Sequence, residues 1–235
     1  RTRSMPRQES IRRERGGNRF VRHTGIAAPY MLDNVSTDIP SPALTDLTQG
    51  LGRDRGTAQP ADPGATAFAN VRYLADGSED PDFPFNQEAF RRASIMIVGL
   101  NYGTGSSRTG AITRPLAAWG VQVYIGESFG PIFLTNAVQY GVLTVELPRP
   151  QLEAVAQWAR DNNGVEMTVD LEREIIVMPG AAPISFQTDP RVRTKLMNGM
   201  HDLEEIEPHL PEAETKRAEH MRARPWVYQP RGPSD

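Results

Sequence analysis

The sequence has 235 residues, 38% hydrophobic and 23% charged, enough for one large domain or one domain with tails. No apolar run approaches the roughly 18 to 20 residues of a membrane span, and none follows the basic N-terminus, so we expect a cytoplasmic protein. The net charge of -3 gives no case for nucleic acid, and the lack of cysteine excludes disulfides, a thiol nucleophile and an iron-sulfur cluster ligated by cysteines of this chain.

The first 22 residues are dominated by arginine and have almost no apolar periodicity. A basic segment can contact nucleic acid or an acidic partner, but a solvated extension is the commoner explanation. We therefore predict a disordered extension over residues 1–19, and expect neither nucleic acid nor a membrane as a partner.

Residues 24–38 mix short apolar pieces with Pro29, Asn34 and Asp38, which predicts a strand followed by a polar turn. Residues 41–66 are rich in Gly, Pro, Asp and Arg and have no clear period. A connection of this length inside a compact domain is usually functional or disordered.

The middle of the chain alternates between strand and helix patterns. Residues 94–100 form a continuous apolar run, typical of a strand covered on both faces. Residues 107–119 have helical spacing, and Pro115 predicts a break or kink there. A strand, a helix and another strand are predicted next, over 121–125, 131–140 and 142–147. This alternation predicts parallel pairing through crossovers, and so an α/β fold.

Later residues predict a helix over 151–161 and a hairpin built from 165–170 and 174–177. The charged segment 192–224 is helix-prone. We place it in the same domain, which we expect to span 20–228 and to be followed by a tail over 229–235.

The most informative segment is residues 95–108, an apolar strand that runs into a glycine turn presenting Ser106, Ser107 and Arg108. Glycine lets the backbone turn and approach a ligand closely. The first N–H groups of a helix are unpaired donors at the positive end of a dipole. The turn therefore predicts an anion site.

Several chemistries could use such a turn, and most of them fit poorly. A dinucleotide fingerprint needs glycine where Arg108 stands, a P-loop needs a Gly-Lys-Ser/Thr sequence, and a nucleophile elbow needs Gly-x-Ser-x-Gly. A tight strand-to-helix turn with Ser106 or Ser107 as the N-cap, and no ligand, stays open. The four histidines are too widely spaced to predict a metal site.

Three motifs together resemble a known family. Residues 101–108 (Asn-Tyr-Gly-Thr-Gly-Ser-Ser-Arg), 128–133 (Ser-Phe-Gly-Pro-Ile-Phe) and Asn136 are similar to the swivelling domain of the aconitase superfamily, above all to the small subunits of 3-isopropylmalate dehydratases, also called isopropylmalate isomerases. Further similar segments are 23–29, 34–38, 72–83 and 225–226. The resemblance runs from about residue 20 to 227.

The resemblance implies a three-layer β/β/α swivelling domain acting as the small subunit of a hydro-lyase of leucine biosynthesis. Such an enzyme isomerises 2-isopropylmalate and 3-isopropylmalate by dehydration and rehydration. The resemblance also implies a large partner subunit carrying a 4Fe-4S cluster, whose open iron is a Lewis acid for the hydroxyl and a carboxylate of the substrate. This chain itself would bind no metal or cofactor.

Residue roles follow from the same resemblance. Ser106 matches the family's catalytic base. Ser107 and Arg108 match groups that bind a substrate carboxylate, and Asp38 matches an acidic residue of the site's charge network. Arg53 and Arg55 lie in the long loop where relatives shape substrate specificity, and either could reach a second carboxylate. Arg53 is the one expected to contact the substrate.

Two departures from the family pattern leave the substrate open. Most members continue the Ser-Ser-Arg motif with Glu-His, whereas this chain has Thr109-Gly110, and it has Thr104 where relatives often have Cys or Glu. A dehydratase of another hydroxy-diacid, such as a methylmalate, dimethylmalate or citraconate type, is therefore an alternative. A second alternative is a non-catalytic paralogue that only binds a partner.

Overall fold

The structure, a computed structural model, describes residues 19–37, 39, 67–68, 71–105, 116, 119–199 and 206–228. The chain divides into two compact units, 1–199 and 200–235. The predicted domain 20–228 contains parts of both units. The predicted tail 229–235, and all of the predicted extension except Arg19, lie outside the described residues.

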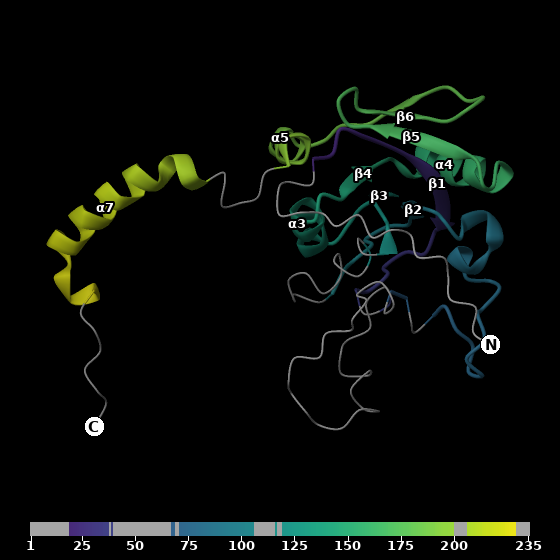
Figure 1. Cartoon of the computed structure of the whole chain (residues 1–235), viewed down its shortest axis with the longest axis horizontal. Coiled ribbons are helices and arrows are strands. Elements are labelled where there is room, and N and C mark those ends of the chain that lie inside the picture. The colour runs from purple at the N-terminus through teal and green to yellow at the C-terminus, as the bar shows by residue number, and fades with distance from the viewer. Residues whose placement is uncertain are drawn as a thin grey trace. The chain divides into compact units, whose positions relative to one another are not determined.

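The first unit is built on one mixed sheet of seven strands in the order β4-β3-β2-β1-β5-β6-β7 (Figure 1). Strands β1 to β4 pair in parallel, and β1, β5, β6 and β7 pair antiparallel. The strand bounds are β1 Arg22–Tyr30, β2 Ile95–Val98, β3 Val123–Gly126, β4 Leu143–Glu146, β5 Glu166–Asp170, β6 Ile175–Val177 and β7 Ile184–Ser185.

Strand β1 belongs to both parts of the sheet. Its first half, Arg22 to Ile26, pairs antiparallel with β5, and its second half, Ala27 to Tyr30, pairs in parallel with β2. Gly25 lies just before the change of partner, where the side chains of His23 and Ser94 form a hydrogen bond of 2.6 Å. A single strand therefore joins the two halves of the sheet.

The apolar run predicted as a doubly covered strand is confirmed, because all four residues of β2 are buried. Successive side chains of a strand point to opposite faces. Accordingly Ile95 and Ile97 lie in one hydrophobic cluster, and Met96 and Val98 lie in another. The core therefore consists of two clusters, one for each face of the sheet.

Helices contribute to both clusters. Helix α4 (Arg149–Asp161) packs against β1 and β2 through buried residues at helical spacing: Leu152, Val155, Ala156 and Ala159. Helix α3 (Pro131–Gln139) places Phe133 and Ala137 in the second cluster, together with the short 3-10 helices Pro84–Asn86 (η2) and Glu88–Phe90 (η3). The α/β class expected for the fold is confirmed.

The elements predicted over 121–147 and the hairpin after residue 165 are also confirmed, to within two residues at most boundaries. The antiparallel pairing of β5 with β6 confirms that hairpin. The predicted helix 107–119 and loop 41–66 lie outside the described residues, except for Leu116 and Trp119.

The helix-prone C-terminal segment divides between the two units. Helix α5 (Pro190–Asn198) starts at an Asp189 cap and ends at Gly199, whose φ of 66° is the left-handed conformation that closes helices. The second unit contains α7 (Leu210–Ala223) between the 3-10 helices Glu207–His209 (η4) and Pro225–Val227 (η5). Among the helices of the described residues, none has the length and apolar character to cross a membrane.

The crowding at Gly25 makes a testable prediction. A Cβ atom there would clash with the Oγ of Ser94 and lie 2.9 Å from the Nε2 of His23. Gly25→Ala is therefore expected to lower the free energy of unfolding of the full chain by about 1–3 kcal/mol, as other overpacked sites do. Chemical denaturation measures this cost.

The matched background is Ser94→Ala, which removes the clashing oxygen. In the Ser94→Ala background, Gly25→Ala should lower the free energy of unfolding by less, because positions 25 and 94 are in contact. An equal cost in both backgrounds would contradict the proposed clash.

Candidate functional site

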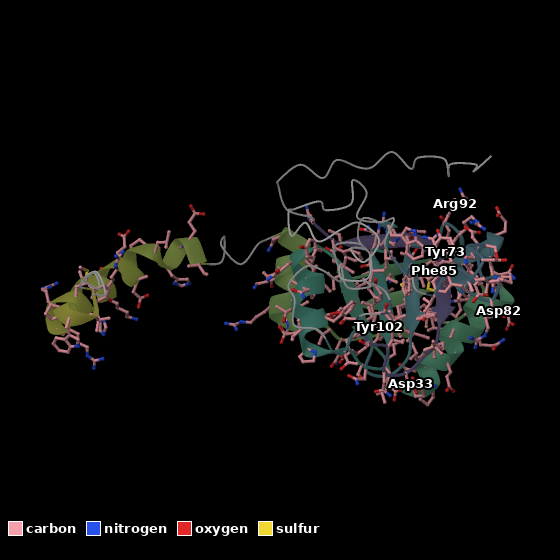
Figure 2. The ribbon with its side chains drawn as sticks, turned by 90° about the horizontal axis from the view of Figure 1, so that it is seen from below. Asp33, Tyr73, Asp82, Phe85, Arg92 and Tyr102 are labelled. Carbon is pink, nitrogen blue, oxygen red and sulfur yellow. The ribbon has the colours of Figure 1, made fainter. Side chains whose placement is uncertain are left out.

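The carboxyl ends of β1, β2 and β3 lie at one edge of the sheet, the usual position of ligand sites in open α/β sheets. Figure 2 shows Asp33, just beyond β1, at one edge of the first unit and Arg92, which precedes β2, on the opposite side. The chain segments that follow the three strands form the candidate site.

These segments remain paired beyond the ends of the strands. The middle segment, residues 101–104, forms a parallel bridge with the first at Ser36 and Thr104, and another with the third at Tyr102 and Phe129. The N–H of Gly103 donates to the carbonyl of Val35 at 2.9 Å. The glycine turn is therefore held from both sides by backbone hydrogen bonds.

Close packing explains two of the glycines. Gly103 has a φ of 73°, and a Cβ atom there would lie 2.6 Å from the ring of Phe133. A Cβ atom at Gly130 would lie 2.5 Å from the carbonyl oxygen of Gly103. A side chain at either position would force the turn and the start of α3 apart.

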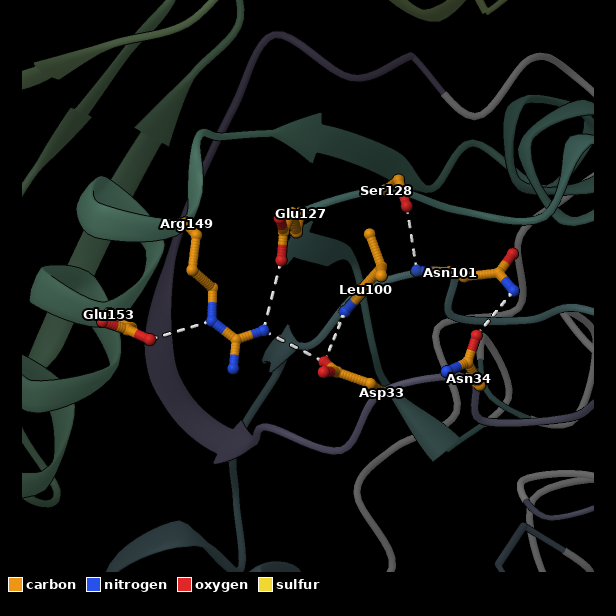
Figure 3. A network of polar contacts seen from close by, with 8 residues as sticks. All are labelled: Asp33, Asn34, Leu100, Asn101, Glu127, Ser128, Arg149 and Glu153. Atoms are coloured by element: carbon orange, nitrogen blue, oxygen red, sulfur yellow. Dashed lines mark hydrogen bonds and ion pairs between the residues drawn. The ribbon is translucent and has the colours of Figure 1, made fainter.

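Polar contacts anchor the beginning of the turn (Figure 3). The Oδ1 of Asp33 accepts the N–H of Leu100 at 2.8 Å, and the N–H of Asn34 donates to the carbonyl of Leu100 at 2.7 Å. The Nδ2 of Asn101 donates to the Oδ1 of Asn34 at 2.9 Å, and its backbone N–H donates to the Oγ of Ser128 at 2.9 Å.

The guanidinium of Arg149 connects Asp33 to two further carboxylates, those of Glu127 and Glu153. The Nη1 of Arg149 lies 3.0 Å from the Oδ1 of Asp33 and 3.2 Å from the Oε2 of Glu127, and its Nε lies 2.9 Å from the Oε1 of Glu153. The Leu100 N–H, and then Arg149, lower the pKa of Asp33. Hydrogen bonds to Glu153, Asp33 and Glu127 raise the pKa of Arg149. Asp33 and Arg149 therefore stay charged at neutral pH.

Aromatic rings pack beneath the turn. The rings of Tyr102 and Tyr124 lie 5.6 Å apart, and both contact Phe133 edge-on. Burial raises the pKa of both tyrosines well above the usual value, so their hydroxyls stay protonated. These tyrosines act as packing under the site rather than as bases.

The predicted site residues Ser106, Ser107, Arg108, Asp38 and Arg53 all lie outside the described residues.

The described backbone nevertheless brings the residue before Asp38 next to the segment that leads to Ser106. Thr37, which precedes Asp38, donates its N–H at 2.9 Å to the carbonyl of Thr104, two residues before Ser106.

Sequence reasoning missed Asp33 and Arg149, which contact each other across 116 positions. One signal was available, because Arg149 lies two residues before the predicted helix 151–161, and a cation at the start of a helix opposes the helix dipole. Within the described part of the chain, no group of three or more His, Asp or Glu side chains could hold a metal ion.

Comparisons with known proteins identify the family of the chain. Residues 18–150 match the aconitase C-terminal domain family. The 3-isopropylmalate dehydratase small subunit of Gluconobacter oxydans (strain 621H) is 39% identical over 213 residues, covering 89% of this chain and 95% of that protein. Its counterpart in Gluconacetobacter diazotrophicus is 37% identical over 208 residues, covering 88% and 96%.

A solved structure supports the fold. A 3-isopropylmalate dehydratase from Methanocaldococcus jannaschii superimposes with a TM-score of 0.54 over 83% of this chain and 99% of that one, at 21% identity. At this identity the likeness shows the fold alone. Since the family match spans more than half of the chain and the similarity to the curated relatives spans nearly all of it, the chain belongs to the 3-isopropylmalate dehydratase small-subunit family, with an aconitase C-terminal domain.

Proposed function

We propose that this chain is the small subunit of a hydro-lyase that isomerises 2-isopropylmalate and 3-isopropylmalate by dehydration and rehydration. The observation that carries the proposal is the similarity, over 89% of the chain, to a protein named 3-isopropylmalate dehydratase small subunit. The glycine turn held between the ends of β1 and β3 supports it, because such a turn can present side chains to a ligand at fixed positions.

In this proposal Ser106 is the catalytic base. As an alkoxide it takes the proton from the carbon next to a substrate carboxylate during dehydration, and it returns a proton to carbon during rehydration. A free serine hydroxyl is far too weak an acid for this role. Arg108 and neighbouring backbone N–H donors favour the charged form and so activate it.

Four other residues bind the substrate in this proposal. The planar fork of Arg108 accommodates one carboxylate, and Ser107 donates a hydrogen bond to it. Asp38 belongs to the charge network of the site. The neighbouring Thr37 supports this role, because its N–H donates to the carbonyl of Thr104 in the segment that leads to Ser106. Arg53 reaches a second carboxylate.

The partner in this proposal is a large subunit that carries a 4Fe-4S cluster. When bound there, the cluster supplies a Lewis acid for the substrate hydroxyl and a carboxylate. This chain has no cysteine, so the cluster's thiolate ligands would come from the large subunit. The residues of this chain supply the opposite wall of the active site: the base, the carboxylate donors and the turn that holds them.

The Thr109-Gly110 pair after the Ser-Ser-Arg motif favours one alternative substrate class, another small hydroxy-diacid. The deciding experiment assays the anaerobically copurified complex of both subunits against isopropylmalate, citraconate and dimethylmalate. If kcat/KM is highest for isopropylmalate, the proposal is supported. If it is highest for another substrate, the chain belongs to a dehydratase of that hydroxy-diacid. A stable complex that converts none of them is the result expected of a non-catalytic paralogue.

The assignment of the base predicts the effect of Ser106→Ala. In the reconstituted complex it should lower kcat by about two to four orders of magnitude, the usual contribution of general acid–base catalysis. Steady-state kinetics measure the loss. Ser185→Ala, at an exposed serine of β7, is the matched control and should leave kcat unchanged. Near-normal turnover of the Ser106 variant would rule out this base.

The assignment of Arg108 predicts a different kinetic signature. Arg108→Lys keeps the positive charge but loses the bidentate fork, so KM should rise at least about tenfold, the equivalent of one lost charge-assisted hydrogen bond. Substrate-saturation curves of the same complex measure this change. An unchanged KM would place Arg108 outside the carboxylate site.

A further inference from the structure

The glycine turn contains backbone conformations that need support from outside. Asn34 and Asn101 both have a φ of 56°, and Gly103 and Gly105 have φ values of 73° and 108°. The left-handed conformation is unfavourable for most residues other than glycine, although asparagine adopts it more readily than most. Such conformations persist only where surrounding contacts over-determine them. Contacts at Leu100 and Asn101 hold the start of the turn.

Asp33 is one of the side chains that contact the start of the turn. Its carboxylate accepts the Leu100 N–H and packs against the backbone of Gly99, where a Cβ atom would overlap the Asp33 oxygen. The Asp33 side chain is 43% exposed, so neighbouring apolar groups do not enclose it. Its orientation therefore depends on its polar partners.

Among the described residues, the charged partner of Asp33 is Arg149, the first residue of α4. A cation at this end of a helix is disfavoured by the helix dipole, and the first turn of α4 contains no acidic residue. Contacts with Asp33 and Glu127, beyond the ends of β1 and β3, and with Glu153 offset this cost. Figure 3 shows the guanidinium between these carboxylates, with Asp33 pointing on toward Leu100.

We propose that Arg149 is a positioning residue of the active site, which holds the Asp33 carboxylate on the Leu100 N–H and so fixes the turn that leads to Ser106. This inference rests on the proposed function of Ser106. In this proposal Arg149 acts through Asp33 and not on the substrate itself. It acts by keeping the turn in the arrangement in which the base faces the substrate.

The experiment compares Arg149→Gln with Arg91→Gln in the complex of both subunits. Arg91 is the matched control, because it is similarly exposed and pairs with Glu79 at 2.8 Å, outside the site. Arg149→Gln should lower kcat about tenfold while KM changes less than about threefold, because the base loses its alignment. Arg91→Gln should leave kcat unchanged. An equal loss in both variants would indicate general destabilisation and overturn the proposal.

A double-mutant cycle tests whether Arg149 acts through Asp33. Asp33→Asn keeps an acceptor for Leu100 but loses the charge that Arg149 holds. Asp33→Asn combined with Arg149→Gln should therefore lower kcat no further than Arg149→Gln alone. Fully additive losses would mean that Arg149 acts by another route. Arg149→Lys, which can keep one ion pair, should restore part of the lost kcat.

Hydrogen exchange gives a readout that does not depend on the substrate. The amide of Leu100 should exchange faster in Arg149→Gln than in the wild type, and at the wild-type rate in Arg91→Gln. Unchanged exchange in Arg149→Gln would overturn the positioning role even if activity fell. A wild-type complex that is inactive on all three substrates would instead overturn the proposed function.

Discussion

The fold depends on the double pairing of β1. With nine residues, β1 is long enough to pair with two different strands. Its first half pairs antiparallel with β5, and its second half pairs in parallel with β2. Since its side chains alternate between faces, Ala27 lies in one core cluster and Ala28 in the other. A change in the path of β1 would therefore move both clusters and the segment that follows the strand.

The same pairing continues into the candidate site. Residues 33–37, 100–104 and 128–130 stay hydrogen-bonded after the strands end, so the turn is an extension of the sheet rather than a free loop. A site on rigid elements keeps its groups closer to a productive geometry than a site on an unsupported loop. This continuity joins the buried core at Val98 to the turn before Ser106.

The charged network at this edge is exposed, and exposed ion pairs individually contribute little to stability. In the proposed complex, a large subunit that covers this edge would exclude water from the network. Reduced solvent screening would then strengthen the contacts of Arg149 with Asp33 and Glu127. The network would therefore hold the turn most firmly in the assembled enzyme.

The sequence by itself determined the α/β class, most of the elements between 94 and 177, and the glycine turn as the candidate site, because local periodicity and turn residues encode these features. The motif around Ser106 also indicated the family. Only the tertiary structure decided that β1 joins both parts of the sheet and that Asp33 binds Arg149. These pairings join residues far apart in sequence through hydrogen bonds and charges, which leave no periodic pattern along the chain.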